Sequence, residues 1–208
     1  MRGSFRLPPV YPITDTQISG LSHAEQVALF ADGGATVVQL REKRSAPSKF
    51  YEEAKAALAT AAARGVQLII NDRVDIALAL GVAGVHLGQD DLPPAAARRV
   101  LGDDAVIGFS THSVVQAIEA AQFPIDYLAI GPIFATRSKE NPDPVVGLEG
   151  LRTVREAARG IPLVGIGGIT PANVSEVFEA GADSVAMIAG LWSQPKDVSA
   201  TLRTLLER

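Results

Sequence analysis

The chain has 208 residues, of which 47% are hydrophobic, and it carries a formal net charge of -4 at pH 7. This length suits one domain with a sizeable core, and the slight negative charge gives no general attraction to nucleic acid or to an anionic membrane. The lack of cysteine excludes a disulfide framework, a thiol nucleophile and a thiolate metal site, which leaves oxygen and nitrogen ligands for any metal.

Nothing in the sequence predicts export or membrane insertion. No apolar run approaches the roughly 20 residues that span a bilayer, and residues 1–9 lack the apolar core of a secretory signal. We therefore expect a cytoplasmic protein with one domain over residues 1–208, in which residues 1–9 form a flexible N-terminal extension. Small molecules are the expected partners, and neither nucleic acid nor membrane is expected. The sequence leaves open whether the chain forms a homo-oligomer.

Short apolar runs alternate with helical patterns along the whole chain. The predicted strands cover residues 10–14, 37–40, 68–70, 84–87, 106–109, 127–130, 163–166 and 184–188. The predicted helices cover residues 22–32, 47–64, 74–80, a segment opened by Pro93 and Pro94, 113–121, 149–158, 173–180 and 196–206. Eight alternations predict an α/β fold, a single-domain (β/α)8 TIM barrel near its lower size limit, with a doubly wound open sheet as the alternative.

Acidic side chains follow the third and fourth predicted strands. Asn71 and Asp72 come directly after residues 68–70, and Asp91 comes shortly after residues 84–87. Neighbouring parallel strands lie about 4.8 Å apart, so Asp72 and Asp91 are placed to share one Mg²⁺. The alternative is that both acids are solvated or cap helices.

Cations follow other strand ends. Arg41, Lys43 and Lys139 would face the two acids at the same rim, where three cations and a metal suit a diphosphate better than a single phosphate. Lys139 belongs to the long irregular segment 131–147, whose length and cations predict a lid over the site. Taken singly, each cation also fits an ordinary surface position.

A glycine-rich turn and three histidines complete the candidate groups. Residues 165–170 and the helix after them offer backbone N–H groups to an anion, although a tight turn would need the same glycines. His23, at the opening of a helix, and His86, in mid-strand, are expected to be packing or hydrogen-bonding residues. His112 stands at a strand exit and could transfer a proton.

Five motifs in order along the chain together resemble thiamine phosphate synthase, a family that includes the related thiazole tautomerases. They are QLREK at 39–43, NDRVD at 71–75, GVHLGQDD at 84–91, GPIF at 131–134 with Thr136 and Lys139, and GIGGI at 165–169. The resemblance implies a transferase that couples 4-amino-5-hydroxymethyl-2-methylpyrimidine diphosphate with 4-methyl-5-(2-phosphoethyl)thiazole or its carboxylate. The expected products are thiamine phosphate and diphosphate, formed by a dissociative substitution with Mg²⁺ as cofactor.

The resemblance also implies a role for each matching residue. Those that would orient the pyrimidine are Gln39 and Ser110. Those that would hold the diphosphate are Arg41, Lys43, Asn71 and Lys139, and Mg²⁺ would be bound by Asp72 and Asp91. The thiazole phosphate would be received by Thr136, Ser138, Gly168 and the backbone of Ile188 and Ala189. The residues implied in the chemical step are Arg41, Lys43, Ser110 and Lys139.

The chain departs from the family pattern at three positions. Ala135, Ser138 and Ala189 stand where family members usually have proline, threonine and serine. Two other functions stay open: a thiazole tautomerase with His112 as its proton shuttle, and a non-catalytic regulatory barrel that binds thiamine phosphate. Retention of the two acids and Lys43 favours the synthase, because a tautomerase would not need them.

Overall fold

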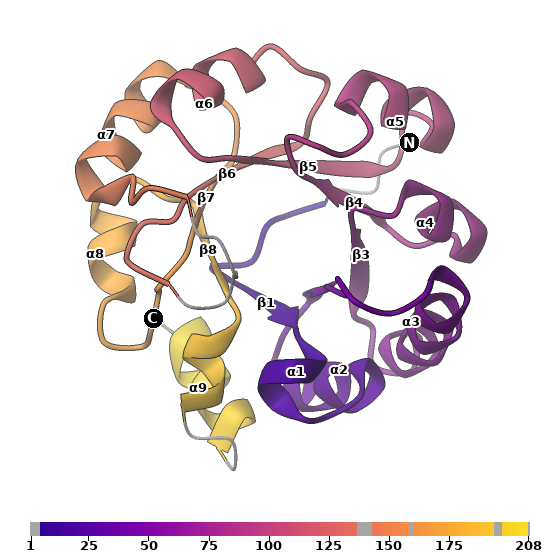
Figure 1. Ribbon diagram of the computed structural model, residues 1–208. Helices are drawn as coiled ribbons and strands as arrows, with labels where there is room; N and C mark the ends of the chain where they lie inside the picture. The colour runs from indigo at the N-terminus through magenta and orange to yellow at the C-terminus, as the bar shows by residue number, and fades with distance from the viewer. Residues whose placement is uncertain (1–4, 137–142, 159, 194–196, 208) are drawn as a thin grey trace.

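The strands of the computed structural model, which describes residues 5–136, 143–158, 160–193 and 197–207, close into one parallel barrel (Figure 1). The strands are β1 (Val10–Thr14), β2 (Val37–Leu40), β3 (Gln67–Asn71), β4 (Gly84–Leu87), β5 (Val106–Thr111), β6 (Tyr127–Ile130), β7 (Leu163–Ile166) and β8 (Ser184–Met187). Because β1 pairs with both β2 and β8, the sheet has no free edge. The predicted (β/α)8 barrel is confirmed and the open sheet is excluded.

The helices surround the barrel on its outer side (Figure 1). They are α1 (Thr16–Ser19), α2 (His23–Asp32), α3 (Pro47–Ala62), α4 (Val74–Leu80), α5 (Pro94–Leu101), α6 (Val114–Ala120), α7 (Gly147–Ala157), α8 (Val174–Glu179), the 3-10 helix η1 (Ala189–Ser193) and α9 (Val198–Leu206). None of the described helices is long and apolar enough to cross a membrane. The sequence predicts neither α1 nor η1, since each is too short to carry a periodic pattern.

Local capping explains several of the helix ends. The Ser22 side chain accepts from the Glu25 N–H while Glu25 accepts from the Ser22 N–H, and this capping box begins α2. Ser113 accepts from the Gln116 N–H at the start of α6. At the other end of α4, Gly81 adopts φ 62°, which glycine reaches without steric penalty.

Two apolar clusters lie on the two sides of the sheet. The outer cluster fills the space between strands and helices, and it includes Val38, Leu40 and Ile70. The inner cluster fills the barrel and includes Tyr11 and Tyr127. Each fully buried Leu or Ile contributes about 1.5–3 kcal/mol, so packing on both faces holds the strand ends in fixed positions.

Residues 5–9 contact the barrel before β1 begins. The Phe5 ring stacks on Tyr127 with centroids 6.2 Å apart, and the Pro9 carbonyl accepts from the Val185 N–H at 2.9 Å. Residues 1–4 of the expected N-terminal extension lie outside the described residues. The described part of that extension therefore packs against the barrel.

Candidate active site

Acids that follow β3 and β4 meet at the carboxyl-terminal mouth of the barrel. The Asp91 carboxyl group lies close enough to Asp72 to raise the pKa of the Asp72 carboxyl group. The Gly88 N–H donates to Asp91 Oδ2 at 2.7 Å and fixes that carboxylate in the loop after β4. The structure thus brings together the two acids that the sequence places at adjacent strand ends.

Asp72 is held in an unusual backbone conformation. Its φ of 63° lies in the left-handed region, where it is the only non-glycine residue of the described chain. Its N–H donates to the His86 carbonyl at 2.8 Å, which ties this strained residue to β4. Such strain costs about 1–3 kcal/mol and gathers at functional sites. The fold therefore holds Asp72 in a backbone conformation that non-glycine residues disfavour, and this places its side chain at the mouth.

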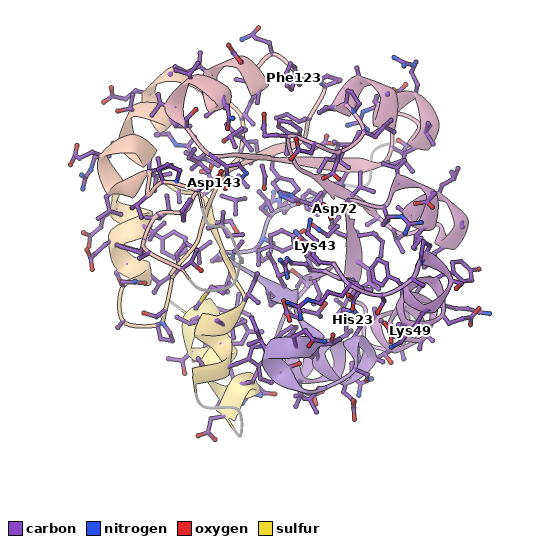
Figure 2. All side chains as sticks on the ribbon, in the orientation of Figure 1. His23, Lys43, Lys49, Asp72, Phe123 and Asp143 are labelled. Atoms are coloured by element: carbon purple, nitrogen blue, oxygen red, sulfur yellow. The ribbon has the colours of Figure 1, made fainter. Side chains whose placement is uncertain are left out.

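Lys43 comes to Asp72 from the loop after β2. Its Nζ lies 2.5 Å from Asp72 Oδ2, and Figure 2 shows the two side chains together near the barrel axis. Burial raises the pKa of the Asp72 carboxyl, the bonded Lys43 ammonium opposes that rise, and the Asp91 carboxylate adds to it. A further cation at this point would favour ionisation of both acids.

Arg41 is anchored rather than solvated. Its Nη1 donates to Asp15 Oδ2 at 2.6 Å, and both side chains are largely buried, with exposures of 16% and 10%. Asp15 Oδ1 accepts from the N–H groups of Gln17 and Ile18, so the same acid begins α1. The sequence interpretation misses Asp15, although an acid directly after β1 is the signal that could have found it.

Asn71 ends β3 with a buried and unsatisfied donor. The residue is only 6% exposed, and its Nδ2 has no hydrogen-bond partner among the described residues. A buried donor without a partner costs about 1–3 kcal/mol, which a ligand oxygen would recover. Asn71 is therefore the most direct indication of a ligand-binding group beside Asp72.

A chain of hydrogen bonds crosses the barrel interior from Gln39 to Ser110. Gln39 Nε2 donates to the Tyr11 hydroxyl at 3.3 Å, which lies 3.0 Å from the Tyr127 hydroxyl. His86 Nδ1 lies 2.9 Å from the Tyr127 hydroxyl, and His86 Nε2 lies 2.8 Å from Ser110 Oγ. The two residues that the resemblance assigns to the pyrimidine are thus the ends of one network.

The hydrogen bonds of this network are donated in one direction, from Gln39 toward Ser110. Burial raises the pKa of both Tyr11 and Tyr127, so both phenols keep their protons. The Gln39 amide only donates here, so Tyr11 passes its proton toward Tyr127 and Tyr127 toward His86 Nδ1. His86 then donates from Nε2 to Ser110, whose own hydroxyl proton is left for a ligand.

The glycine-rich turn after β7 packs against the start of the segment 131–147. Gly167 and Gly168 have φ of 98° and 65°, and a Cβ on Gly168 would come within 2.5 Å of the Ala135 carbonyl oxygen. The Ile133 N–H donates to Ile166 O at 2.9 Å, which sets the two segments side by side. These glycines therefore permit the close approach of the two backbone segments.

The other described residues that are predicted to bind the thiazole phosphate lie around this turn. Thr136 follows Ala135 directly, and Ala189 begins η1 immediately after Ile188. A Cβ on Gly190 would lie 2.2 Å from Ile169 O, so η1 also approaches the turn closely. Ser138 and Lys139 lie outside the described residues.

Comparison with known proteins identifies the family. The family model described as thiamine monophosphate synthase matches residues 10–191. The chain belongs to the thiamine monophosphate synthase family. The family resemblance of the sequence and the predicted transferase class are thereby confirmed.

Individual members of the family match over nearly their whole length. The thiamine-phosphate synthase of Chloroflexus aurantiacus is 44% identical over 197 residues, covering 94% of this chain and 90% of that protein. The thiamine-phosphate synthase of Koribacter versatilis is 46% identical over 205 residues, covering 94% of each. The structure of a thiamine phosphate pyrophosphorylase from Pyrococcus furiosus superposes with a TM-score of 0.83 at 34% identity, covering 95% of both chains.

Within this thiamine monophosphate synthase family barrel, His112 contacts the backbone at the start of the segment 131–147. Its Nδ1 lies 3.0 Å from Gly131 O and 3.5 Å from Asp143 Oδ2. Because a carbonyl only accepts, Nδ1 carries the proton. These contacts join the two described parts of the segment, which gives His112 a structural role beside the proton transfer that the sequence suggests.

Proposed function

We propose that the chain is a thiamine-phosphate synthase that joins 4-amino-5-hydroxymethyl-2-methylpyrimidine diphosphate to 4-methyl-5-(2-phosphoethyl)thiazole or its carboxylate. Two relatives with that enzyme name support the proposal by their match over nearly the whole chain. The observation that carries it is the Asp72 carboxylate, which is bonded to Lys43 and close enough to Asp91 for that acid to raise its pKa, beside the unpartnered amide of Asn71. The sequence predictions of a cytoplasmic location and of small-molecule partners are part of this proposal.

The reaction needs a stabilised leaving group more than a strong base. The bond between the pyrimidine methylene carbon and the diphosphate oxygen breaks, and its electron pair departs with the diphosphate. The lone pair of the thiazole nitrogen then forms the new carbon–nitrogen bond, which leaves the positive charge on the thiazolium ring. With the carboxylate substrate, CO2 also leaves, and the electron pair of the broken bond stays on the ring carbon, which takes up a proton from solvent. Fixed positive groups at the departing oxygens therefore lower the barrier, and a covalent nucleophile is not required.

The donor set at the mouth fits Mg²⁺. Asp72 and Asp91 present carboxylate oxygens close enough that Asp91 raises the pKa of Asp72, and oxygen atoms are the ligands that Mg²⁺ prefers. Mg²⁺ bound there would neutralise negative charge on the leaving diphosphate. Asp72 directly follows β3 and Asp91 lies in the loop after β4, so neighbouring strands of the barrel position both acids.

Other residues of the chain would bind and orient the two substrates. Lys43 and the Asn71 amide would contact diphosphate oxygens, and Arg41 retains N–H donors beyond the one that Asp15 accepts. Lys139 would add a further cation, with the segment 131–147 closing over the site. Gln39 and Ser110, fixed by the interior network, would orient the pyrimidine. The thiazole phosphate would be received by Thr136, Ser138, Gly168 and the backbone of Ile188 and Ala189.

Diphosphate release from the two substrates tests this function. We expect release that requires Mg²⁺, and a fall in kcat/KM of about 10²–10³-fold for Asp72→Asn or Asp91→Asn. Asp90→Asn is the matched control, because it removes the same charge from an exposed neighbour of Asp91 and should leave kcat/KM within about twofold. Full activity in both Asp72→Asn and Asp91→Asn would contradict the metal assignment.

Isomerisation and thiamine phosphate binding, measured beside diphosphate release, distinguish the two other functions. A thiazole tautomerase would isomerise the thiazole carboxylate phosphate without metal, and His112→Asn would abolish this. A regulatory barrel would bind thiamine phosphate and release no diphosphate with any substrate pair. Either result would overturn the proposed synthase.

A further inference from the structure

A second cluster of potential metal ligands lies outside the barrel mouth. His23 on α2, Glu42 in the loop after β2 and Glu53 on α3 each offer one ligand atom, and these three atoms lie within 4.8 Å of one another. Figure 2 shows His23 toward the outer helices, away from Lys43 and Asp72 near the barrel axis. The proposed synthase reaction uses none of these three side chains.

His23 places an unpartnered nitrogen in this cluster. The residue is completely buried, and its Nδ1 lies 2.7 Å from the Thr14 hydroxyl. Its Nε2 has no hydrogen-bond partner among the described residues and lies 3.9 Å from Glu42 Oε2. Buried polar atoms are nearly always bonded, so a nitrogen left open toward a carboxylate calls for an explanation.

The two glutamates also turn one oxygen each toward the cluster. Glu42 Oε1 is occupied, because it accepts from the N–H groups of Arg44 at 2.6 Å and Ser45 at 3.0 Å. Its Oε2 faces His23, and the side chain is only 8% exposed. Glu53 Oε2 is buried and has no hydrogen-bond partner among the described residues. A nitrogen and two carboxylate oxygens therefore face one another.

We propose that His23, Glu42 and Glu53 bind a divalent transition-metal ion of the Zn²⁺ class. One imidazole and two carboxylates are a ligand set that Zn²⁺ accepts, whereas Mg²⁺ prefers oxygen alone. Zn²⁺ bonds of about 2.0–2.1 Å would draw the three ligand atoms to about 3.3 Å apart. Rotation of the two glutamate side chains would supply this contraction.

The surroundings supply both support and access for such an ion. The Thr14 hydroxyl bonds the other nitrogen of the His23 ring and so fixes its orientation, as partners of metal-bound histidines do. On the open side, Glu42 and Glu53 line a surface hollow of about 630 Å³. Water or a small exogenous ligand can reach the fourth metal position from this hollow.

The position of Glu42 connects this site to the barrel mouth. Glu42 lies between Arg41 and Lys43, two of the residues proposed to hold the diphosphate. An ion bound to His23, Glu42 and Glu53 would tie α2, the loop after β2 and α3 together. The proposed metal thus stabilises the segment that carries both cations, without contact with the substrate.

Metal binding by the full-length, untagged chain tests the site. Zn²⁺ is titrated calorimetrically in excess Mg²⁺, which would fill the site proposed at the mouth, and Co²⁺ absorption reports imidazole ligation. We expect one tight equivalent for the native chain, and affinity lowered more than about tenfold by Glu53→Gln. The matched control is Glu52→Gln, which removes the neighbouring exposed acid of α3 and should change affinity by less than about twofold.

Thermal unfolding gives a readout that is independent of enzyme activity. At a hundredfold excess over Kd, Zn²⁺ should raise Tm by about 5 °C or more in the native chain and in Glu52→Gln, but not in Glu53→Gln. Glu53 is partly exposed on a long helix, so this variant should fold, as far-UV circular dichroism will check. The absence of a tight Zn²⁺ equivalent, or equal losses in Glu52→Gln and Glu53→Gln, would overturn the proposal. Neither result bears on diphosphate release.

Discussion

His86 Nε2 lies 2.8 Å from Ser110 Oγ, and this bond joins a residue at the mouth to the buried tyrosines of the barrel interior. The same imidazole accepts from the Tyr127 hydroxyl through Nδ1, at 2.9 Å. Because Tyr127 donates to His86 Nδ1, the His86 proton lies on Nε2, and His86 therefore donates to Ser110. Its hydroxyl proton is presented to the mouth because the interior network is complete.

Tyr127→Phe should break this network, because it removes the hydroxyl while the aromatic ring still fills the barrel interior. The change removes the hydrogen bonds that the Tyr127 hydroxyl makes to His86 Nδ1 and to the Tyr11 hydroxyl, so we expect a loss of about 1–3 kcal/mol in the free energy of unfolding. The KM for the pyrimidine diphosphate should rise, because Ser110 loses its fixed direction. Urea unfolding and steady-state kinetics measure the two effects. Tyr51→Phe on the outer helix α3 is the control, and equal losses in both variants would contradict this role.

Asp72 should show opposite effects on stability and on activity. At φ 63°, a β-carbon costs roughly 1–2 kcal/mol that glycine avoids. We therefore expect Asp72→Gly to be more stable than Asp72→Ala by about 1 kcal/mol, with diphosphate release abolished in both. Urea unfolding of the two metal-free variants measures the difference. If Asp72→Ala were the more stable variant, the assigned strain would be wrong.

The strand ends were predictable from the sequence because a parallel barrel leaves them little freedom. A buried apolar run that stops at Asn71 and Asp72 must deliver these side chains to the carboxyl-terminal mouth. The partners of these side chains were not predictable, since the bond between Arg41 and Asp15 joins residues 26 positions apart. The same holds for the contact between Tyr11 and Tyr127, which depends on the register of strands that close the barrel.

Asp15→Asn should weaken diphosphate binding while it preserves α1. Asparagine also begins helices well, so the bonds to the N–H groups of Gln17 and Ile18 can persist. The charge-assisted bond to Arg41 is weakened, and the guanidinium loses its fixed position. We expect the KM for the pyrimidine diphosphate to rise about tenfold with kcat less affected. An unchanged KM would show that Arg41 is positioned without Asp15.

The buried imidazole of His23 should make stability depend on pH in the metal-free chain. Burial lowers its pKa from the ordinary 6.5, against the opposing carboxylates of Glu53, Glu42 and Asp15. The unfolded chain therefore takes up this proton more readily than the folded chain. The stability contributed by neutral His23 is present above about pH 6.5 and is lost as the pH falls toward the lowered pKa.

His23→Gln should remove that part of the pH dependence. We expect the free energy of unfolding of the native chain to fall more steeply than that of the variant between about pH 6.5 and about pH 5. Urea unfolding in the presence of a chelator measures both slopes. Parallel slopes in the two proteins would contradict the assigned effect of burial on His23.

Comparison of Gly168→Ala with Gly65→Ala should separate the cost of backbone strain from the cost of steric overlap between an added Cβ and a neighbouring segment. Gly168 and Gly65 have nearly equal φ, 65° and 67°, but an added Cβ meets Ala135 O at 2.5 Å only at Gly168 and finds open space at Gly65. Both alanine variants should lose roughly 1–2 kcal/mol of stability from the left-handed conformation. Only Gly168→Ala should displace the start of the segment 131–147 and raise the KM for the thiazole phosphate. Kinetics of the two variants decide this, because an equal KM in both would remove the turn after β7 from the phosphate site.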